Sequence, residues 1–198
     1  MARFLSFIVR TAVYIAIAIG GGLASAWLMV HSGSRLTTAT SGPWVAWTMA
    51  GRAEADPYTR AHTVRLGLLP INTTLALAWH ALTDSEGDRL RSTCEYIVET
   101  EALDVTWWSL AVFDESGNLI RNNADRYAFN AATALRDADG GVSVALSRDA
   151  RPGNWLPTGG AGRITLAFTV QDPKWVAQVG DEQARARALP LIRRIACR

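Results

Sequence analysis

Hydrophobic and polar positions divide this chain of 198 residues into two parts. Residues 11–30 read TAVYIAIAIGGGLASAWLMV without a charge, and Arg3 and Arg10 precede them. Twenty helical residues at about 1.5 Å each span roughly the 30 Å hydrocarbon core of a bilayer. Because positive residues favour the cytoplasmic side, the pattern predicts a cytoplasmic N-terminus over residues 1–10 and a single transmembrane helix over residues 11–30.

A secretory signal peptide is the alternative interpretation of the same run. Ala24-Ser25-Ala26 matches a small-residue cleavage site, and cleavage following Ala26 would release the remainder into the periplasm. The apolar pattern continues through Trp27 to Val30, which is further than a signal peptide needs, so the sequence favours an uncleaved anchor. Both interpretations place the larger part of the chain outside the cytoplasm.

Small residues recur at four-residue spacing within this run. The pairs are Gly20 with Ala24, Gly21 with Ser25, and Gly22 with Ala26. Such a stripe lets two helix backbones approach closely in a membrane, so it is a candidate helix–helix contact. The alternative is that these residues are simply common in membrane helices.

After the apolar run, the pattern changes to turns and short alternating segments. Residues 31–41 are polar and predict a tether, and residues 42–198 have the length of one domain. Asp56-Pro57 predicts the start of a short helix. Period-2 alternation predicts strands, most clearly at residues 94–99, 105–113, 142–147 and 164–170. Together with frequent turn signals, these strands predict a mainly β fold, an antiparallel sandwich or barrel with one or two short helices.

Composition narrows the function classes only slightly. The formal net charge of +2 does not indicate nucleic-acid binding. The two cysteines, Cys94 and Cys197, both lie on the non-cytoplasmic side, where an oxidising environment favours a disulfide over two buried thiols. The sequence contains no Cys-x-x-Cys motif or Cys/His cluster, so we expect neither a metal site nor a cofactor.

Polar and aromatic residues concentrate in two loops, although no known catalytic motif is present. Residues 122–127 read NNADRY, and residues 153–157 read GNWLP. The candidate ligand-binding residues are Asp125, Arg126, Tyr127, Asn154 and Trp155. The alternative is that these side chains satisfy their own backbone and close one end of the sandwich.

The order of these segments resembles the domain of unknown function 1214 family. The resemblance rests on DPYTRA at residues 56–61, WWSL at 107–110 with Asp114 and Gly117, NADRY at 123–127 and GNWLP at 153–157, and it covers roughly residues 42–173. It implies a jelly-roll-like antiparallel β-sandwich of the small, N-terminally membrane-anchored bacterial branch. The family has no established catalytic residues. Residues 166–169 read LAFT where longer members tend to read LRLY, so shared ligand chemistry is not implied.

These observations predict an envelope protein held in the bacterial inner membrane, with its N-terminus cytoplasmic and its main domain periplasmic. The expected role is a non-catalytic binding or assembly module, and the resemblance implies a partner of the domain of unknown function 1254 family. One alternative is an enzyme that modifies an envelope glycan or lipid through the five candidate ligand-binding residues. Another is a small transmembrane subunit of a larger complex, joined through the small-residue stripe.

Overall fold

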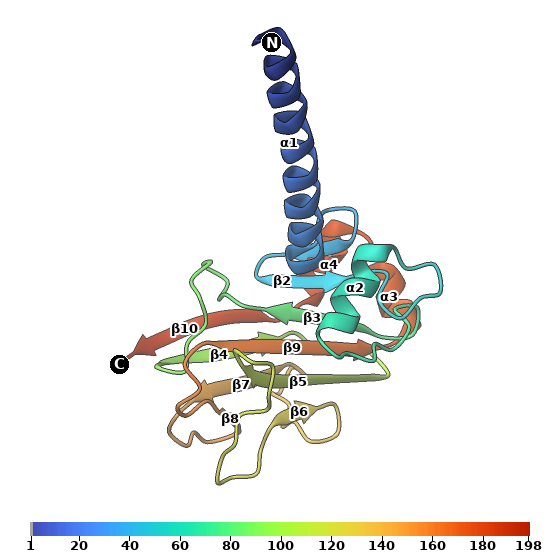
Figure 1. The fold of residues 1–198 in the computed structure, drawn as a ribbon. Helices are drawn as coiled ribbons and strands as arrows, with labels where there is room; N and C mark the ends of the chain where they lie inside the picture. The colour runs from blue at the N-terminus through green and yellow to red at the C-terminus, as the bar shows by residue number, and fades with distance from the viewer. Residues whose placement is uncertain (1) are drawn as a thin grey trace.

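The computed structural model describes residues 2–198, so Met1 of the predicted cytoplasmic segment lies outside the described residues. Four helices and ten strands follow one another along these residues (Figure 1). Their order is α1 (Ala2–Ser32), β1 (Thr38–Ser41), β2 (Trp44–Trp47), α2 (Pro57–Arg65), β3 (Leu77–Ala81), β4 (Cys94–Thr100), β5 (Trp107–Asp114), β6 (Ala128–Asn130), β7 (Val142–Ser147), β8 (Asn154–Pro157), β9 (Ile164–Gln171), α3 (Pro173–Gln178), α4 (Glu182–Ala188) and β10 (Leu191–Cys197).

The N-terminal helix α1 stands away from the rest of the molecule (Figure 1). It is longer than the predicted span at both ends, because residues 4–9 are apolar apart from Ser6 and no proline interrupts the segment. Gly33 ends the helix in a left-handed conformation, with φ at 68°, and its N–H donates to the Met29 carbonyl over 3.1 Å. By length and composition, α1 is long and apolar enough to cross a membrane.

The remaining chain forms two sheets. One has six strands in the order β1-β2-β3-β9-β5-β6, and the other has four in the order β10-β4-β7-β8. The fold is therefore mainly β, as predicted. The expectation of purely antiparallel pairing is wrong at one position, because β7 and β8 run parallel.

The alternation seen in the sequence places one side of each strand in a shared core. In β9, Ile164, Leu166, Phe168 and Val170 are all fully buried. Alternate residues of β4 and β7 meet them from the other sheet, so one hydrophobic cluster joins the two sheets. Large aromatic rings fill the interior, namely Trp44, Trp79, Trp108, Tyr96 and Phe168.

Three segments differ from their predicted structure. Part of the predicted tether is strand β1, which pairs with β2 from Thr38 to Ser41. The described residues of the domain hold three short helices, because α3 and α4 join α2 where one or two were expected. The arginine-rich C-terminal segment, which the sequence did not identify as a strand, is β10, and it pairs with β4.

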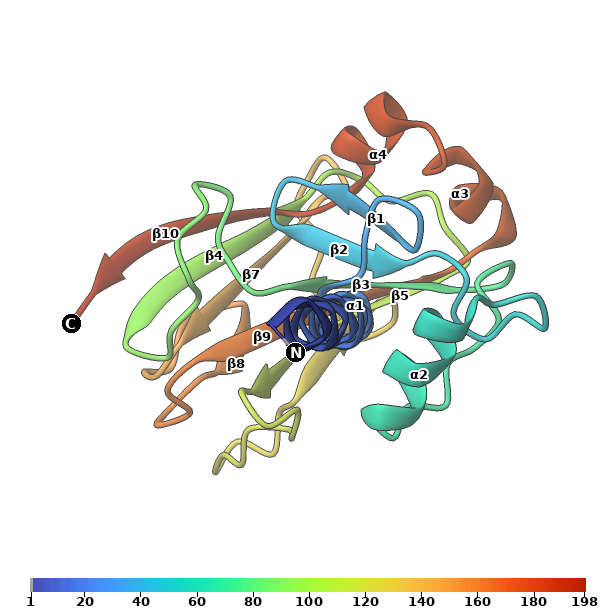
Figure 2. The same ribbon diagram turned by 45° about the horizontal axis from the view of Figure 1, so that its top comes forward.

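Helix α2 lies beside the base of α1 (Figure 2). Its start follows the predicted cap: the Asp56 carboxylate accepts hydrogen bonds from the backbone N–H groups of Tyr58 at 2.9 Å and Thr59 at 3.0 Å. Pro57 occupies the first turn, where a missing N–H costs nothing.

The two cysteines lie at disulfide distance. Cys94 begins β4 and Cys197 ends β10, and their Cα atoms are 3.9 Å apart. The bridge joins residues separated by 103 positions and ties the C-terminal strand to the four-stranded sheet.

Candidate functional site

The two candidate loops meet at the end of the domain that faces away from α1, where β6 and β8 lie (Figure 1). Arg126 precedes β6, and Trp155 lies in β8. One guanidinium Nη atom of Arg126 donates to the Trp155 carbonyl over 3.4 Å. The structure therefore brings Arg126 of one candidate loop into contact with Trp155 of the other.

Two aromatic rings flank the Arg126 guanidinium. Its Cζ atom lies 5.9 Å from the Trp155 ring centroid and 5.6 Å from the centroid of Phe129. Both distances are within the range of cation–π attraction. The sequence analysis did not include Phe129 among the candidate residues. The available signal was an aromatic residue three positions after Arg126.

Asn122 shapes the loop that carries Arg126. Its side-chain oxygen accepts from the backbone N–H groups of Ala124 and Arg126, each at 3.1 Å. Its amide nitrogen donates to the carbonyls of Ile120 at 3.0 Å and Arg126 at 2.8 Å. The loop therefore satisfies much of its own backbone, as the alternative interpretation expected, and this fixes the position of Arg126.

Asp125 and Tyr127 lie on the exposed side of the same loop. Asp125 has a φ of 49°, a left-handed conformation that aspartate tolerates better than most residues. The neighbouring Asp125 carboxylate raises the pKa of the Tyr127 hydroxyl. Asp125 forms no ion pair with a basic group of the described chain.

Asn154 is part of the scaffold. It is buried, and its amide nitrogen donates to the carbonyls of Leu135 at 2.8 Å and Ser143 at 3.0 Å. Its oxygen accepts from the Leu135 N–H over 2.7 Å. These three bonds hold the 131–136 segment against β7 and β8 and leave little of the side chain for a ligand.

Trp155 stabilises the scaffold through its indole N–H and supports Arg126 with its partly accessible ring. Its indole N–H donates to the Ser147 carbonyl over 3.0 Å, which secures the parallel β7–β8 pair. Its ring is only partly buried and supports Arg126. Most donors of the Arg126 guanidinium remain free, because its hydrogen bond to the Trp155 carbonyl uses one nitrogen and no described carboxylate lies within 4.0 Å of it. The arrangement is suited to binding a carboxylate or another anionic group.

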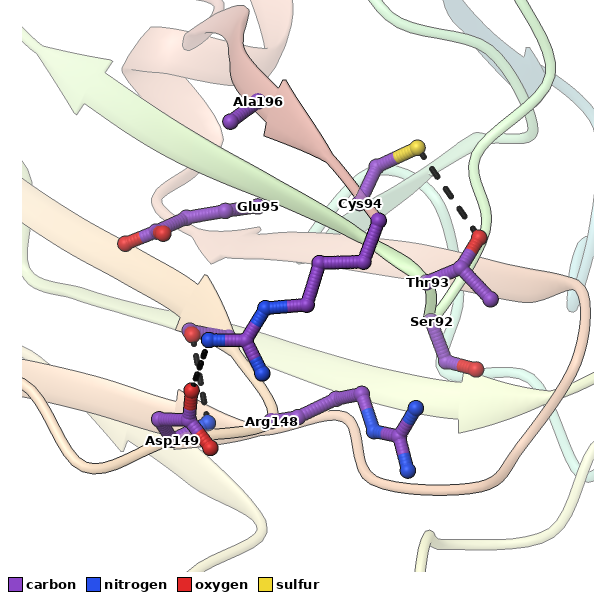
Figure 3. Close-up of a pocket in the computed structure, with 9 residues that line it drawn as sticks. Ser92, Thr93, Cys94, Glu95, Arg148, Asp149 and Ala196 are labelled. Carbon is purple, nitrogen blue, oxygen red and sulfur yellow. Dashed lines mark hydrogen bonds and ion pairs between the residues drawn. The ribbon is translucent and has the colours of Figure 1, made fainter.

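A small cavity lies near the disulfide (Figure 3). Its volume of about 40 Å³ is on the scale of one or two water molecules. Ion pairs stand beside it: Arg151 binds Glu95 over 2.5 and 2.6 Å, which lowers the pKa of Glu95, and Arg198 pairs with Asp149. The cavity is therefore too small to hold an organic ligand, and the charged groups beside it already pair with one another.

A wide surface hollow of about 870 Å³ lies next to the Arg126 loop. Residues 114–121 form one wall and residues 159–161 the other. Arg121 of this wall directly precedes Asn122, so the hollow adjoins the start of the loop that carries Arg126. Among residues 2–198, no group of three His, Cys, Asp or Glu side chains is placed to hold a metal ion.

Two solved structures were found to be similar to this chain. The VPA0106 protein from Vibrio parahaemolyticus superposes with a TM-score of 0.61 at 17% identity over 91% of this chain and 44% of its own. This chain thus spans less than half of that protein's length. A putative uncharacterized protein from Burkholderia cenocepacia gives a TM-score of 0.44 at 16% identity over 61% of this chain and 29% of its own.

No curated protein matches the sequence. A family model, described as "Protein of unknown function (DUF1214)", matches residues 75–175. The match includes the segments at residues 107–110, 123–127 and 153–157 that carry the resemblance, whereas residues 56–61 lie outside it. Because the match covers half of the chain, this protein belongs to the DUF1214 family.

Proposed function

We propose that this protein is a non-catalytic binding or assembly module of the bacterial envelope, anchored in the inner membrane by α1 with its domain in the periplasm. The jelly-roll-like arrangement of the two sheets is part of the same proposal. Its support is the shared core of the two sheets and the length and apolar composition of α1.

The half-buried guanidinium of Arg126 is the observation that carries the binding role. Ordinary surface arginines move freely, whereas Arg126 is held between Phe129 and Trp155 on a loop fixed by Asn122. A pre-positioned cation without an internal carboxylate partner loses little conformational entropy when an acidic group of a partner binds it.

The location of Arg126 favours a protein partner. The β6–β8 end lies opposite the end from which α1 leaves the domain (Figure 1). An anchor at one end and a binding surface at the other would present Arg126 away from the membrane. A protein of the domain of unknown function 1254 family is the partner we propose, and the open hollow at the start of the Arg126 loop would provide additional contact area.

Two alternatives retain a specific basis. The Asp125 carboxylate and the neighbouring Tyr127 hydroxyl are the groups that an envelope glycan- or lipid-modifying enzyme would use. For a transmembrane subunit, the relevant feature is the open side of α1, where a Cβ added at Gly20, Gly21 or Gly22 would meet no described atom within 4 Å apart from the backbone of α1 itself.

The proposal is tested by co-producing the tagged full chain with a domain of unknown function 1254 protein from the same genome. We expect the full chain to resist alkaline extraction from membranes and to retain the partner in mild detergent. Arg126→Ala is expected to lose the partner, and Arg163→Ala, at another exposed arginine, is expected to keep it.

Folding of the Arg126→Ala variant is the necessary control. The two cation–π contacts contribute about 0.5–1 kcal/mol each at a partly exposed site, so the variant remains folded. Failure of the wild-type chain to retain the partner would contradict the partner assignment. Equal retention by both arginine variants would show that Arg126 does not carry recognition.

A further inference from the structure

An unusual number of large apolar side chains are exposed around the base of α1. They come from the turn after α1, from the end of α2 and from the loop that follows it. We call this surface the apolar collar and define it by Leu36, Val64, Leu66, Leu68, Leu69 and Ile71. Leu69 is the extreme case, with 98% of its surface exposed.

The collar is held at the place where α1 enters the domain. The Nδ1 atom of His62 lies 2.8 Å from the Val30 carbonyl oxygen, and the Arg65 guanidinium contacts the His31 ring. The loop then folds back on α2, because the Leu68 N–H donates to the Thr63 carbonyl over 2.9 Å. The collar residues of α2 and its loop therefore lie within a few residues of direct contacts to the last turn of α1.

The contact with His62 lies where the uncharged run ends, at Val30. Ala26, Met29 and Val30 are partly buried, whereas Trp27, Leu28 and the preceding turns of α1 are exposed. If residues 11–30 cross the bilayer, the contact at Val30 places the His62 side chain at the hydrocarbon boundary and α2 beside that boundary. Exposed leucines next to the boundary are placed to meet lipid.

Charge around the collar fits an anionic lipid surface. From residue 57 to residue 82, the charged residues are Arg60 and Arg65. Two acidic residues precede this segment: Asp56 accepts the hydrogen bonds of the α2 cap, and Glu54 is exposed. Each basic residue near such a surface contributes about 1 kcal/mol of attraction, and apolar side chains at an interface enter about 5–10 Å. Aromatic residues typical of interfaces, Trp27 and Trp47, stack on His31 and His62 at the same level.

We infer that the apolar collar is a second membrane-contacting element, which enters the leaflet from which α1 emerges and binds a lipid surface with anionic head groups. The inference rests on the proposed anchoring of α1. The anchor α1 attaches the domain to the membrane, and a collar inserted beside it also fixes the orientation of the domain relative to the membrane. It therefore determines where the Arg126 surface points.

The test uses the full chain in vesicles of phosphatidylethanolamine and phosphatidylglycerol, with a nitroxide label on one introduced cysteine. The described chain has no free cysteine, so the label reacts at the new position. The three variants are Leu69→Cys in the collar, Ile17→Cys in α1 and Leu135→Cys, whose side chain is 65% exposed in the loop after β6. Relative access of oxygen and of a water-soluble nickel complex reports the depth of each label.

We expect the oxygen-to-nickel ratio at Leu69→Cys to be several-fold higher than at Leu135→Cys and closer to that at Ile17→Cys. A water-like ratio at Leu69→Cys with a lipid-like ratio at Ile17→Cys would overturn the collar and leave the anchor standing. A water-like ratio at Ile17→Cys would overturn the anchoring itself. Dipolar broadening between Leu69→Cys labels with low access to both reagents would mean that a second copy covers the collar, and this too would overturn the inference.

Discussion

The Nδ1 atom of His62 lies 2.8 Å from the backbone carbonyl oxygen of Val30, so α2 is bonded directly to the last turn of α1. The same imidazole stacks on Trp47 of β2, with ring centroids 4.1 Å apart. One side chain thus joins the N-terminal helix, α2 and the six-stranded sheet. Rigid placement of the domain on α1 depends on this junction.

The junction is expected to weaken in acid. Burial lowers the pKa of His62 below the usual 6.5, and the nearby charges of Arg65 and His31 lower it further, against the opposing effect of the Val30 carbonyl. The unfolded chain therefore binds a proton at His62 before the folded chain does, and stability is lost as pH falls from 6.5 through the folded pKa. His62→Gln removes the titrating group and keeps a donor, so its unfolding temperature should fall less over this range. Parallel pH profiles for the wild type and the variant would contradict the prediction.

Removing the cap of α2 should loosen the same junction. Asp56→Ala loses the two backbone hydrogen bonds at the helix start and a third from the Thr59 hydroxyl, and the expected cost is about 1 kcal/mol. Hydrogen exchange of the amides in α2 measures the change. Asp181→Ala is the matched control, because Asp181 precedes α4 without a side-chain cap bond. Similar exchange in both variants would show that the cap does not stabilise α2.

The disulfide should stabilise the domain mainly through β10. It closes a loop of 103 positions, for which the chain-entropy model gives about 4–5 kcal/mol, and native bridges typically contribute about 2–5 kcal/mol. The double variant Cys94→Ala, Cys197→Ala should lower the free energy of unfolding by that amount in denaturant titrations. Because β10 is an edge strand, its amides should exchange first. An unchanged unfolding midpoint would contradict this prediction.

The sequence predicts those parts of the fold in which local pattern and burial agree. Alternation identifies β9, since its large apolar residues Ile164, Leu166, Phe168 and Val170 all face the core. The strand β10 escapes prediction because its exposed side carries Arg193 and its pairing with β4 depends on distant residues. The short strands β1 and β6 give too few residues for alternation to be visible.

The candidate site was predictable as a pair of loops but not as a set of roles. Arg126 and Trp155 do meet, whereas Asn154 is buried among backbone groups and serves the scaffold. Sequence spacing cannot distinguish these outcomes, because an amide that binds a ligand and an amide that binds Leu135 have the same chemistry. The partner backbone comes from another part of the chain and becomes visible only in the fold.

Asn154 therefore offers a test of scaffold against ligand binding. Asn154→Ala removes a buried amide and leaves the Leu135 N–H and two carbonyls without this partner, so we expect a loss of about 1–3 kcal/mol in unfolding free energy. Asn123→Ala, at an exposed amide in the neighbouring loop, should change stability by less than about 0.5 kcal/mol. Denaturant titration of both variants measures the difference. Equal, small effects would return Asn154 to the list of ligand candidates.

Asp125 separates the role of the backbone from that of the carboxylate. The backbone at position 125 has a φ of 49°, a left-handed conformation that Asp and Asn tolerate better than Ala. Asp125→Ala should therefore lower the free energy of unfolding by about 1 kcal/mol, whereas Asp125→Asn should be as stable as the wild type. Asp125→Asn also removes the carboxylate that raises the pKa of Tyr127, so this pKa should fall toward 10.0 in a spectroscopic titration. If the site binds a partner through Arg126, Asp125→Asn keeps the partner. If Asp125→Asn folds normally but loses an envelope-modifying activity, the result would instead support the enzyme hypothesis. The substitution replaces the charged carboxylate by a neutral amide and changes little else.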